Sequence, residues 1–415
     1  MFAAFSTALS ALDANGIAVD VVGNNLANLN TPGYKESAAY FRDLVSASLG
    51  AGATQLGFGV AAPLTIRQFT QGAIQASSGS LDAAIQGDGF FVVENNGATQ
   101  FTRAGNFQTD LDGNLLTPTG EYVQGWTATN GVVNTGGAIG NIVVPVGSMQ
   151  APIATSSFTL DANLDASAAV GTQWSTPVTA YDSLGTSHVL TIDFTKTASN
   201  TWSYTVNIPA ADVTAGSATQ FPSPAGTLQF GQDASGRDGQ LTSANTSPIT
   251  ISIPNLSDGA QTLNLNWNLF NADGSGRITQ YAQASTASAN GQDGSAAAQL
   301  TQVSMGNGGQ IMATYSNGQQ VVVGQLALAS IRNPQSLVAV GNNEYQVQAD
   351  TAPPAIGVAG TGGRGQILGG SLESSNVDIA QELTKLIVLQ SAYQANSKVV
   401  TTVNSLAQAT TNLIP

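Results

Sequence analysis

The 415-residue sequence contains no cysteine and one histidine, and both shortages narrow the chemistry available to it. Without cysteine there are no disulfides, no thiolate metal ligands and no cysteine nucleophile. A single histidine, His188, cannot form a multi-histidine metal site. From the sequence we therefore expect no catalytic residues, no cofactor and no metal ion.

Charged residues are also scarce, at 9% of the chain, and 11 basic against 25 acidic residues give a net charge of −14. Binding to nucleic acid or to an anionic membrane surface needs grouped Lys and Arg, so neither partner is expected. No run of about 18 apolar residues occurs, and no membrane insertion is expected. No basic residue precedes Lys35, so we expect export, if any, without a cleaved Sec signal.

Apolar residues at alternating steps of four and three predict a helix at each end of the chain. The first ladder comprises Phe5, Leu9, Leu12, Gly16, Val19, Gly23 and Leu26. The second comprises Ile379, Leu383, Leu386, Leu389, Tyr393, Asn396, Val400, Val403 and Ala407. Ser374 or Ser375 is the predicted start of the second helix, with Glu382 and Lys385 as a surface ion pair.

The sequence pattern in the middle of the chain predicts β structure. Asn-Gly and Asp-Gly pairs recur, as at 88–89 and 317–318, and favour the tight turns of hairpins. Strand-like runs such as "GFFVVE" and "HVLTIDFT" lie between them. Composition shifts near residue 150 and again in "STASANGQDGSAAA", from Ser285. The fold class is therefore mainly β with α-helical termini, in discontinuous nested domains.

Four parts are predicted from these boundaries. Residues 1–30 and 376–415 form a terminal helical core domain, and residues 31–75 form a connecting segment. Residues 76–150 and 297–375 form a middle β domain, into which residues 151–296 are inserted as an outer β domain.

The terminal ladders are too narrow to stabilise each other alone. Each presents one apolar face, and burying that face against a single partner does not offset the entropy of ordering a whole helix. We therefore expect both helices to need further neighbours, and to order fully when several copies pack together.

The first ladder ends abruptly at "NNLANLNTPGYK", residues 24–35. Pro32 has a fixed φ and moves Thr31 out of the helical region, while Gly33 permits a turn that other residues resist. The side chains of Asn24, Asn25 and Asn28 either bond neighbouring subunits or satisfy the end of their own helix.

Three further signals resemble chemical motifs. Gly360, Gly362 and Gly365 match the glycine spacing of a dinucleotide-binding motif. That motif must be followed by a helix, whereas the run "QILGGSLE" that follows here has the pattern of a strand. We therefore expect these glycines to lie in a loop without a nucleotide. Asp110, Asp112, Asn114 and Glu121 have calcium-loop spacing, but Leu115 stands where Gly is needed, so we expect a hairpin turn. His188 is expected at the start of a strand.

The motif at residues 24–35, together with "SNVDIAQELTKLIVLQSAYQANSKVV" from Ser375, resembles the paired terminal signatures of bacterial flagellar rod and hook proteins. "AIQGDGFFVV" and "FTRAGNFQTDLDGNLLTPTGEYVQGW" resemble the first β segment of that superfamily. "TPVTAYDSLGTSHVLTIDF" resembles the inserted domain of hook proteins, and "YSNGQQVVVGQLALASIRNPQSLVAVGNNEY" resembles the returning half of their middle domain.

This resemblance implies a structural subunit of the flagellar hook, not an enzyme. The implied subunit polymerises with itself into a flexible tubular joint that transmits torque from rod to filament. In the polymer the two ladders form the core, and Asn24, Asn25, Asn28, Thr31, Pro32, Gly33 and Tyr34 form the turn that leaves it.

The implied location is the extracellular hook at the basal body. The implied partners are the distal rod protein, the hook cap protein, the hook–filament junction protein and the flagellar type III export apparatus. A distal rod or other axial protein is the alternative, and a secreted β-rich adhesin or hydrolase a remote one.

Overall fold

The computed structural model describes residues 2–45, 57–129, 131–233, 236–243 and 248–411, which divide into two units. Unit 1 comprises Met1–Val146, Gln302–Thr314 and Gln320–Pro415, and unit 2 comprises Gly147–Thr301 and Tyr315–Gln319. The fold is mainly β with one long helix near each end, as the sequence predicts. The predicted division into four parts, including the bounds of the inserted part at residues 151 and 296, stays a prediction.

In unit 1 the two helices are α1 (Phe2–Ala27) and α2 (Ile379–Thr411), and the turns η1 (Asn307–Gly309) and η2 (Pro334–Ser336) are 3-10 helices. Its strands are β1 (Ser37–Val45), β2 (Gly57–Arg67), β3 (Ile74–Ala76), β4 (Ala83–Gln86), β5 (Phe90–Asn95), β6 (Ala98–Thr102), β7 (Gln108–Thr109), β8 (Leu115–Leu116), β9 (Tyr122–Thr129), β10 (Val132–Val133), β11 (Gly140–Asn141), β24 (Gln310–Tyr315), β25 (Gln320–Leu326), β26 (Leu328–Ser330), β27 (Val338–Gly341), β28 (Glu344–Gln346), β29 (Ala355–Gly357), β30 (Gln366–Gly369) and β31 (Ser371–Glu373).

The central sheet of unit 1 joins strands from both sides of the insertion. Its order β24-β25-β9-β5-β6-β28-β27 places the early strand β9 beside the late strand β25. All four residues Phe90–Val93 of β5 are buried, because the strand is packed on both faces: Phe90 meets Phe69, and the adjacent Phe91 meets Phe107. The two-stranded sheets β3–β31 and β4–β30 likewise pair an early strand with a late one.

In unit 2 the strands are β12 (Met149–Gln150), β13 (Ser157–Asn163), β14 (Gln173–Tyr181), β15 (Ser187–Ala198), β16 (Thr201–Asn207), β17 (Gln220–Gly231), β18 (Gln240–Ser243), β19 (Ile249–Ile253), β20 (Leu263–Asn268), β21 (Ile278–Thr279) and β22 (Thr286–Gln292), and β23 (Ala298–Met305) runs on into unit 1.

The main sheet of unit 2 has the order β14-β15-β16-β17-β18-β21-β13-β20-β19, with β22 on β13. Its strands alternate buried and outward side chains, as in β13 and β15. The inward residues pack around Trp267, which stacks on Phe158 and meets Tyr204 edge to face at 5.2 Å.

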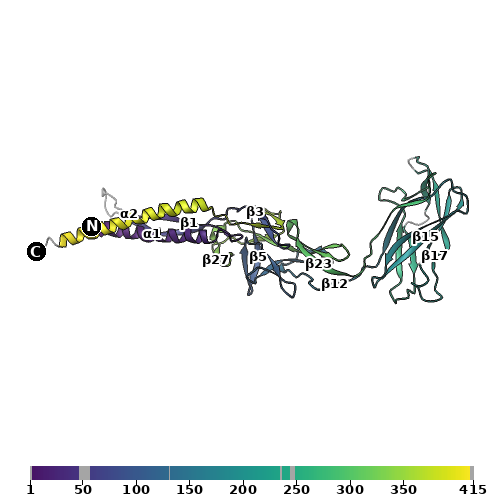
Figure 1. Ribbon diagram of the computed structural model, residues 1–415, viewed down its shortest axis with the longest axis horizontal. Coiled ribbons are helices and arrows are strands. Elements are labelled where there is room, and N and C mark those ends of the chain that lie inside the picture. Colours follow the sequence, from purple (N-terminus) through teal and green to yellow (C-terminus); the bar gives the residue numbers. More distant parts are fainter. Residues whose placement is uncertain (1, 46–56, 130, 234–235, 244–247, 412–415) are drawn as a thin grey trace. The chain divides into compact units, whose positions relative to one another are not determined.

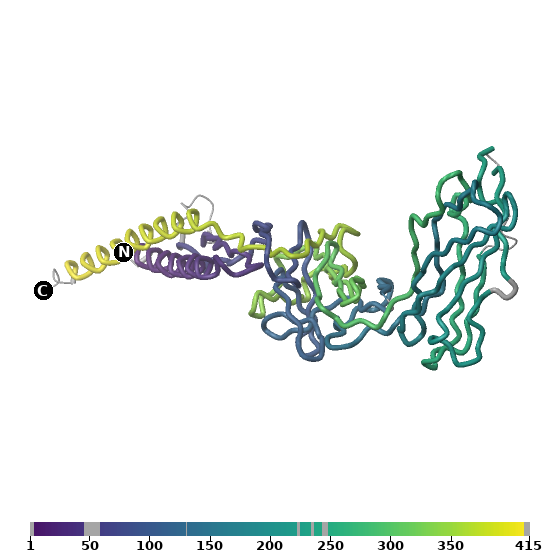
Figure 2. Tube along the Cα trace, turned by 45° about the vertical axis from the view of Figure 1, so that its right-hand side comes forward, coloured from purple at the N-terminus to yellow at the C-terminus, as the bar shows by residue number. Residues whose placement is uncertain are grey.

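The helices of unit 1 lie side by side and run in opposite directions, purple and yellow in both views (Figure 1 and Figure 2). α1 also packs against the β1–β2 hairpin. None of the helices in the described ranges is long and apolar enough to cross a membrane.

Candidate subunit interface

The inner face of α1 is a stripe of small side chains. Ala8, Ala14, Ala18 and Val22 are each at most 4% exposed, and Asn15 and Asn25 continue the same stripe. Small residues let the helix approach its neighbours closely, as the hydrogen bond from the Val60 amide to Ser10 Oγ at 3.2 Å shows. The packing within one chain therefore uses the small residues of α1.

The predicted ladder of α1 lies beside this stripe and is incompletely covered. Phe5, Leu9 and Gly23 are exposed, and Leu12, Gly16, Val19 and Leu26 are half-buried. The large side chains of the ladder thus keep free apolar surface in a single copy.

On α2 the burial is poorer still. Between residues 379 and 410, the span for which side-chain burial is described, Glu382 is the only buried residue. Leu386, Leu389, Val400 and Val403 are half-buried, and Ile379, Leu383 and Tyr393 are exposed. Tyr393, like the other ladder residues, stays a predicted core residue of the polymer.

An apolar hollow of about 310 Å³ lies where α1, α2 and β1 meet. Ala18 and Val22 line it from α1, Phe41 from β1, and Val388 and Leu389 from α2. Phe41 and Val388 are also largely exposed, at 48% and 61%. The helical part of the chain therefore presents exposed helix faces and an unfilled hollow together.

Asn24 and Asn28 in the turn motif satisfy the end of their own helix. Asn28 Nδ2 donates to the Asn24 carbonyl at 2.9 Å and to Asn24 Oδ1 at 2.8 Å, and Thr31 Oγ1 donates to Asn28 Oδ1 at 3.1 Å. Within one chain these residues therefore take the local role, and bonds to neighbouring subunits stay a prediction.

Asn25 has a different role, because it joins three segments of the same chain. It is 1% exposed, and its Oδ1 accepts from the Ser37 amide at 2.9 Å and from the Tyr34 hydroxyl at 3.2 Å. Its Nδ2 donates to the Ser37 carbonyl and to Glu382 Oε2, at 2.8 and 3.1 Å. Asn25 therefore ties α1 to the start of β1 and to α2.

Gly33 makes the turn itself. Its φ is +69°, and its amide donates to the Glu373 carbonyl at 2.8 Å. A Cβ at this position would lie 2.5 Å from the Ala104 amide nitrogen, so glycine is required for conformation and for space. Pro32 accepts through its carbonyl from Asn343 Nδ2 at 3.2 Å, which attaches the turn to the loop before β28.

A buried charge cluster follows the turn. Lys35 Nζ lies 2.7 Å from Glu373 Oε1, and Arg103 lies 3.2 Å from Glu373 Oε2. Lys35 also donates to the Thr70 carbonyl, and Glu373 accepts from the Gly72 amide at 2.8 Å. Burial lowers the pKa of Lys35, and the neighbouring Glu373 carboxylate opposes that shift.

Sequence reasoning did not single out Arg103, Glu373 or Asn376 as site residues. Asn376 Oδ1 accepts from the Glu36 amide at 2.7 Å, and its Nδ2 donates to the Gln68 carbonyl at 3.0 Å. These residues lie hundreds of positions from their partners, and the quoted runs that begin "FTRAG" and "SNVD" and the run "QILGGSLE" contain them.

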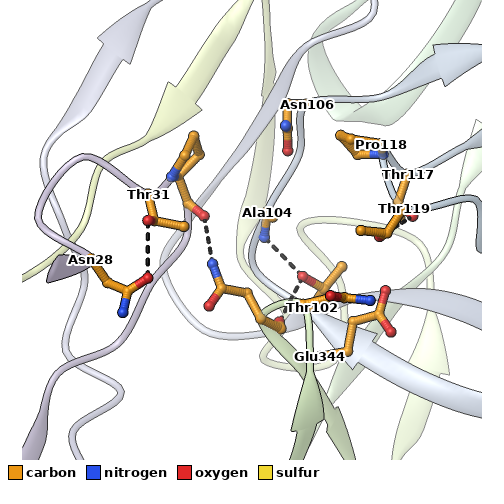
Figure 3. Close-up of a pocket in the computed structure, with 12 residues that line it drawn as sticks. Asn28, Thr31, Thr102, Ala104, Asn106, Thr117, Pro118, Thr119 and Glu344 are labelled. Carbon is orange, nitrogen blue, oxygen red and sulfur yellow. Dashed lines mark hydrogen bonds between the residues drawn. The ribbon is translucent and has the colours of Figure 1, made fainter. Parts of the chain in front are cut away.

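A polar pocket of about 290 Å³ lies between the turn motif and the central sheet. In Figure 3 Asn28 and Thr31 lie on one side of it, and Thr117 and Thr119 lie on the other. Glu344, at its edge, is 3% exposed and adjoins the buried Glu121.

These two carboxyl groups have opposite pKa shifts. Burial and then the Glu121 charge raise the pKa of Glu344 to about 8. Burial acts the same way on Glu121, but hydrogen bonds from Thr117 and Thr119 outweigh it and lower the pKa of Glu121. At neutral pH one proton is therefore held on Glu344.

Two local predictions at α2 are wrong. The helix begins at Ile379 rather than at Ser374 or Ser375, because Asp378 Oδ1 caps it by accepting from the Ala380 and Gln381 amides, at 2.8 and 3.1 Å. Glu382 does bond Lys385, but Glu382 is fully buried, so the pair is not a surface pair.

The motifs that resembled chemical sites have structural roles. Asp110 Oδ1 accepts from the Asp112 and Asn114 amides within the β7–β8 hairpin, which is the predicted turn. Gly360 and Gly362 lie in a loop with positive φ, and β30 follows at Gln366. His188 is the second residue of β15, at the strand start where it was expected.

Four family models match the chain in order. They are described as flagella basal body rod protein at residues 5–35, flagellar hook protein FlgE/F/G D1 domain at 84–163, flagellar basal body protein FlaE D2 domain at 150–295, and flagellar basal body rod FlgEFG protein C-terminal at 368–413. The matched models follow the order of the fold, with a helix at each end, a β body and a β unit inserted into it. This combination defines an axial protein of the bacterial flagellum.

Curated relatives specify which axial protein. The flagellar hook protein FlgE of Borreliella burgdorferi is 31% identical, with 98% of each chain covered. That of Salmonella typhimurium is 30% identical with 99% of each chain covered, and that of Rhizobium meliloti is 32% identical over 100% of this chain and 99% of the relative. The chain belongs to the flagellar hook protein family and is a structural subunit of the hook.

A solved structure shares the fold. The Helicobacter pylori flagellar hook protein FlgE2 aligns with a TM-score of 0.51 at 16% identity, covering 71% of this chain and 99% of that one.

Proposed function

We propose that copies of this chain assemble through the exposed faces of α1 and α2, which form the core of a tubular hook. The observation that carries this proposal is the poor burial of the helices in a single copy: Leu9, Leu383 and Val388 are 45%, 45% and 61% exposed. Exposed apolar surface of this extent on paired helices is typical of a protein–protein interface.

The interface comprises the predicted ladders. Its members are Phe5, Leu9, Leu12, Gly16, Val19, Gly23, Leu26, Ile379, Leu383, Leu386, Leu389, Tyr393, Val400 and Val403. The hollow between α1, α2 and β1 supplies further apolar area for a neighbouring copy. The turn motif and the buried charge cluster fix how the chain leaves the helices.

The flexibility of the hook follows from the different contacts of the helices and of the outer β surfaces. Apolar contact between helices is insensitive to small displacements, because it depends on buried area and has no strict direction. With 9% charged residues, few ion pairs between outer surfaces would have to break as a subunit moves. We infer that this combination lets the tube bend while it turns.

Family membership also supports the remaining parts of the proposal. We infer that the chain performs no catalysis, and that it contacts the distal rod protein, the hook cap protein, the hook–filament junction protein and the type III export apparatus. Electron microscopy of cells would show the loss of a contact as hooks that do not start, do not elongate or do not join a filament.

The interface is tested by Leu9→Asn and Leu383→Asn in the full chain, with Leu111→Asn as the matched control. Leu111 is fully exposed but lies in the β7–β8 hairpin, away from the helices. Sedimentation and electron microscopy should show tubes for the wild type and the control, and monomers for the helix variants. Tubes of normal length from Leu9→Asn and Leu383→Asn would refute the assignment.

Because leucines 9 and 383 are already exposed, the monomer fold should survive both substitutions, as circular dichroism would check. Amide exchange of the monomer gives an independent readout. We expect fast exchange along α2, where almost every residue is uncovered, and strong protection after assembly. Equal protection of α2 before and after assembly would contradict the proposal.

A further inference from the structure

Three connections of unit 2 bring acidic side chains to His188. Asp182 follows β14, Asp212 lies between β16 and β17, and Asp258 lies between β19 and β20. Asp182 is six residues from His188, but Asp212 is 24 residues away, and local spacing gives no sign that Asp212 or Asp258 meets the ring. Asp182 and His188 are buried, and Asp258 is exposed.

The imidazole ring meets a carboxylate at each nitrogen. His188 Nε2 lies 3.0 Å from Asp182 Oδ2, and His188 Nδ1 lies 3.1 Å from Asp212 Oδ2. One ligand atom from each of Asp182, His188 and Asp258 lies within 4.8 Å of the others. Asp182 therefore occupies the Nε2 side of the ring and Asp212 the Nδ1 side, with Asp258 close to the Asp182–His188 pair.

The carboxylates are held in place through other atoms. Asp182 Oδ1 accepts from the Leu184 and Thr186 amides at 2.8 and 2.9 Å, which leaves Oδ2 for the ring. Asp258 Oδ1 accepts from the Ala260 amide at 3.0 Å.

The connections are also bonded to each other. The Gln261 amide donates to Ser183 Oγ at 2.9 Å, and the Ser257 amide donates to the Asp212 carbonyl at 3.0 Å. These two bonds link the β14–β15 connection to the β19–β20 connection, and the latter to the β16–β17 connection.

We propose that His188 Nε2, Asp182 and Asp258 form a binding site for a divalent transition-metal ion, Zn²⁺ being the best fit. Zinc takes nitrogen and carboxylate ligands at about 2.0–2.2 Å, which separates the ligand atoms of a tetrahedral site by about 3.3 Å. The 3.0 Å separation of Nε2 from Asp182 Oδ2 needs to widen by only a few tenths of an ångström. The exposed Asp258 leaves the fourth position to water.

Asp212 fits the role of the group that orients the metal-binding histidine. Metal-ligating imidazoles commonly donate their other N–H to a carboxylate, which fixes the tautomer. The metal would join the β14–β15 and β19–β20 connections, and Asp212 would link the β16–β17 connection to them through His188.

The test is calorimetric titration of the full chain with Zn²⁺, before and after treatment with a chelator. Asp258→Asn removes an exposed ligand and should leave the fold intact. Asp238→Asn is the matched control, since Asp238 is an exposed aspartate of the same unit outside the cluster. A third variant, Asp212→Asn, keeps all three ligands and removes the orienting carboxylate.

We expect one Zn²⁺ per chain in the wild type and in Asp238→Asn, and an affinity about 10–100-fold weaker in Asp212→Asn. Asp258→Asn should lose at least as much. Zinc at 100 times its dissociation constant should lower the unfolding equilibrium constant of unit 2 about 100-fold in the wild type. Absence of saturable 1:1 binding, or equal affinity in Asp258→Asn and Asp238→Asn, would overturn the site.

Discussion

Glu373→Gln is the substitution that most directly tests how the helices are attached to the β body. Glu373 is 1% exposed, and its carboxylate neutralises two buried cations, those of Lys35 and Arg103. Glutamine keeps the shape and one acceptor oxygen. It removes the negative charge, however, and turns an amide donor toward a cationic donor.

The cost follows from the burial of the partners. Lys35 is fully buried and Arg103 is 3% exposed, so water cannot replace the lost carboxylate. Breaking a buried ion pair by removing one partner costs about 3–5 kcal/mol, because a charge is left uncompensated. We expect this loss in the unfolding free energy of unit 1.

Amide exchange of the full chain, followed by mass spectrometry, measures that loss in unit 1 alone. Amides of the buried strand β5 exchange when the whole unit unfolds, so their exchange rate reports its unfolding free energy. A loss of about 3–5 kcal/mol, at about 1.4 kcal/mol per factor of ten, should accelerate this exchange by about 10²–10⁴-fold. Exchange in unit 2 should not change. The matched control is Glu94→Gln, also in unit 1, where the side chain is only half-buried.

A change below about 1 kcal/mol, or one equal to that of Glu94→Gln, would refute the reasoning. It would mean that Lys35 and Arg103 find water or other acceptors when the carboxylate is lost. The double variant Lys35→Met/Glu373→Gln adds a second check. Because the pair is coupled, its loss should be smaller than the sum of the two single losses.

Three further predictions concern single residues of unit 1. The ordinary pKa of the Glu344 carboxyl is 4.5, and the folded chain raises it. Above pH 4.5 the folded chain therefore keeps a proton that the unfolded chain releases. The unfolding free energy should therefore fall as pH rises from about 4.5 to 8. At about 1.4 kcal/mol per pKa unit the fall is at most about 5 kcal/mol. Urea titrations at pH 9 should find Glu344→Gln more stable than the wild type. Gly33→Ala forces a left-handed conformation and a Cβ against Ala104, so its melting temperature should drop with a loss above about 1 kcal/mol. That loss should exceed the loss in Gly97→Ala, where φ is also positive but the added Cβ meets open space. Asp378→Ala removes the cap of α2 and should cost about 1 kcal/mol of helix stability by circular dichroism, and no change would mean that the cap is redundant.

The sequence by itself determined the elements that depend on local spacing. A repeat of four and three residues specified both helices, because side chains at those steps share a helix face. Alternation specified strands such as β15, and the Asp112-Gly113 pair specified the β7–β8 turn through its positive φ. Pro32 and Gly33 likewise placed the end of the first helical region within a few residues.

Only the tertiary structure decided which face of a helix lies inside. The apolar pattern of α1 offers two adjacent stripes, and the structure buries the alanine stripe, because small side chains allow close approach to α2 and the hairpin. It also decided the partners of buried polar groups. Glu373 meets Lys35 across 338 positions and Asn25 meets Glu382 across 357, and local spacing carries no information on contacts over such separations.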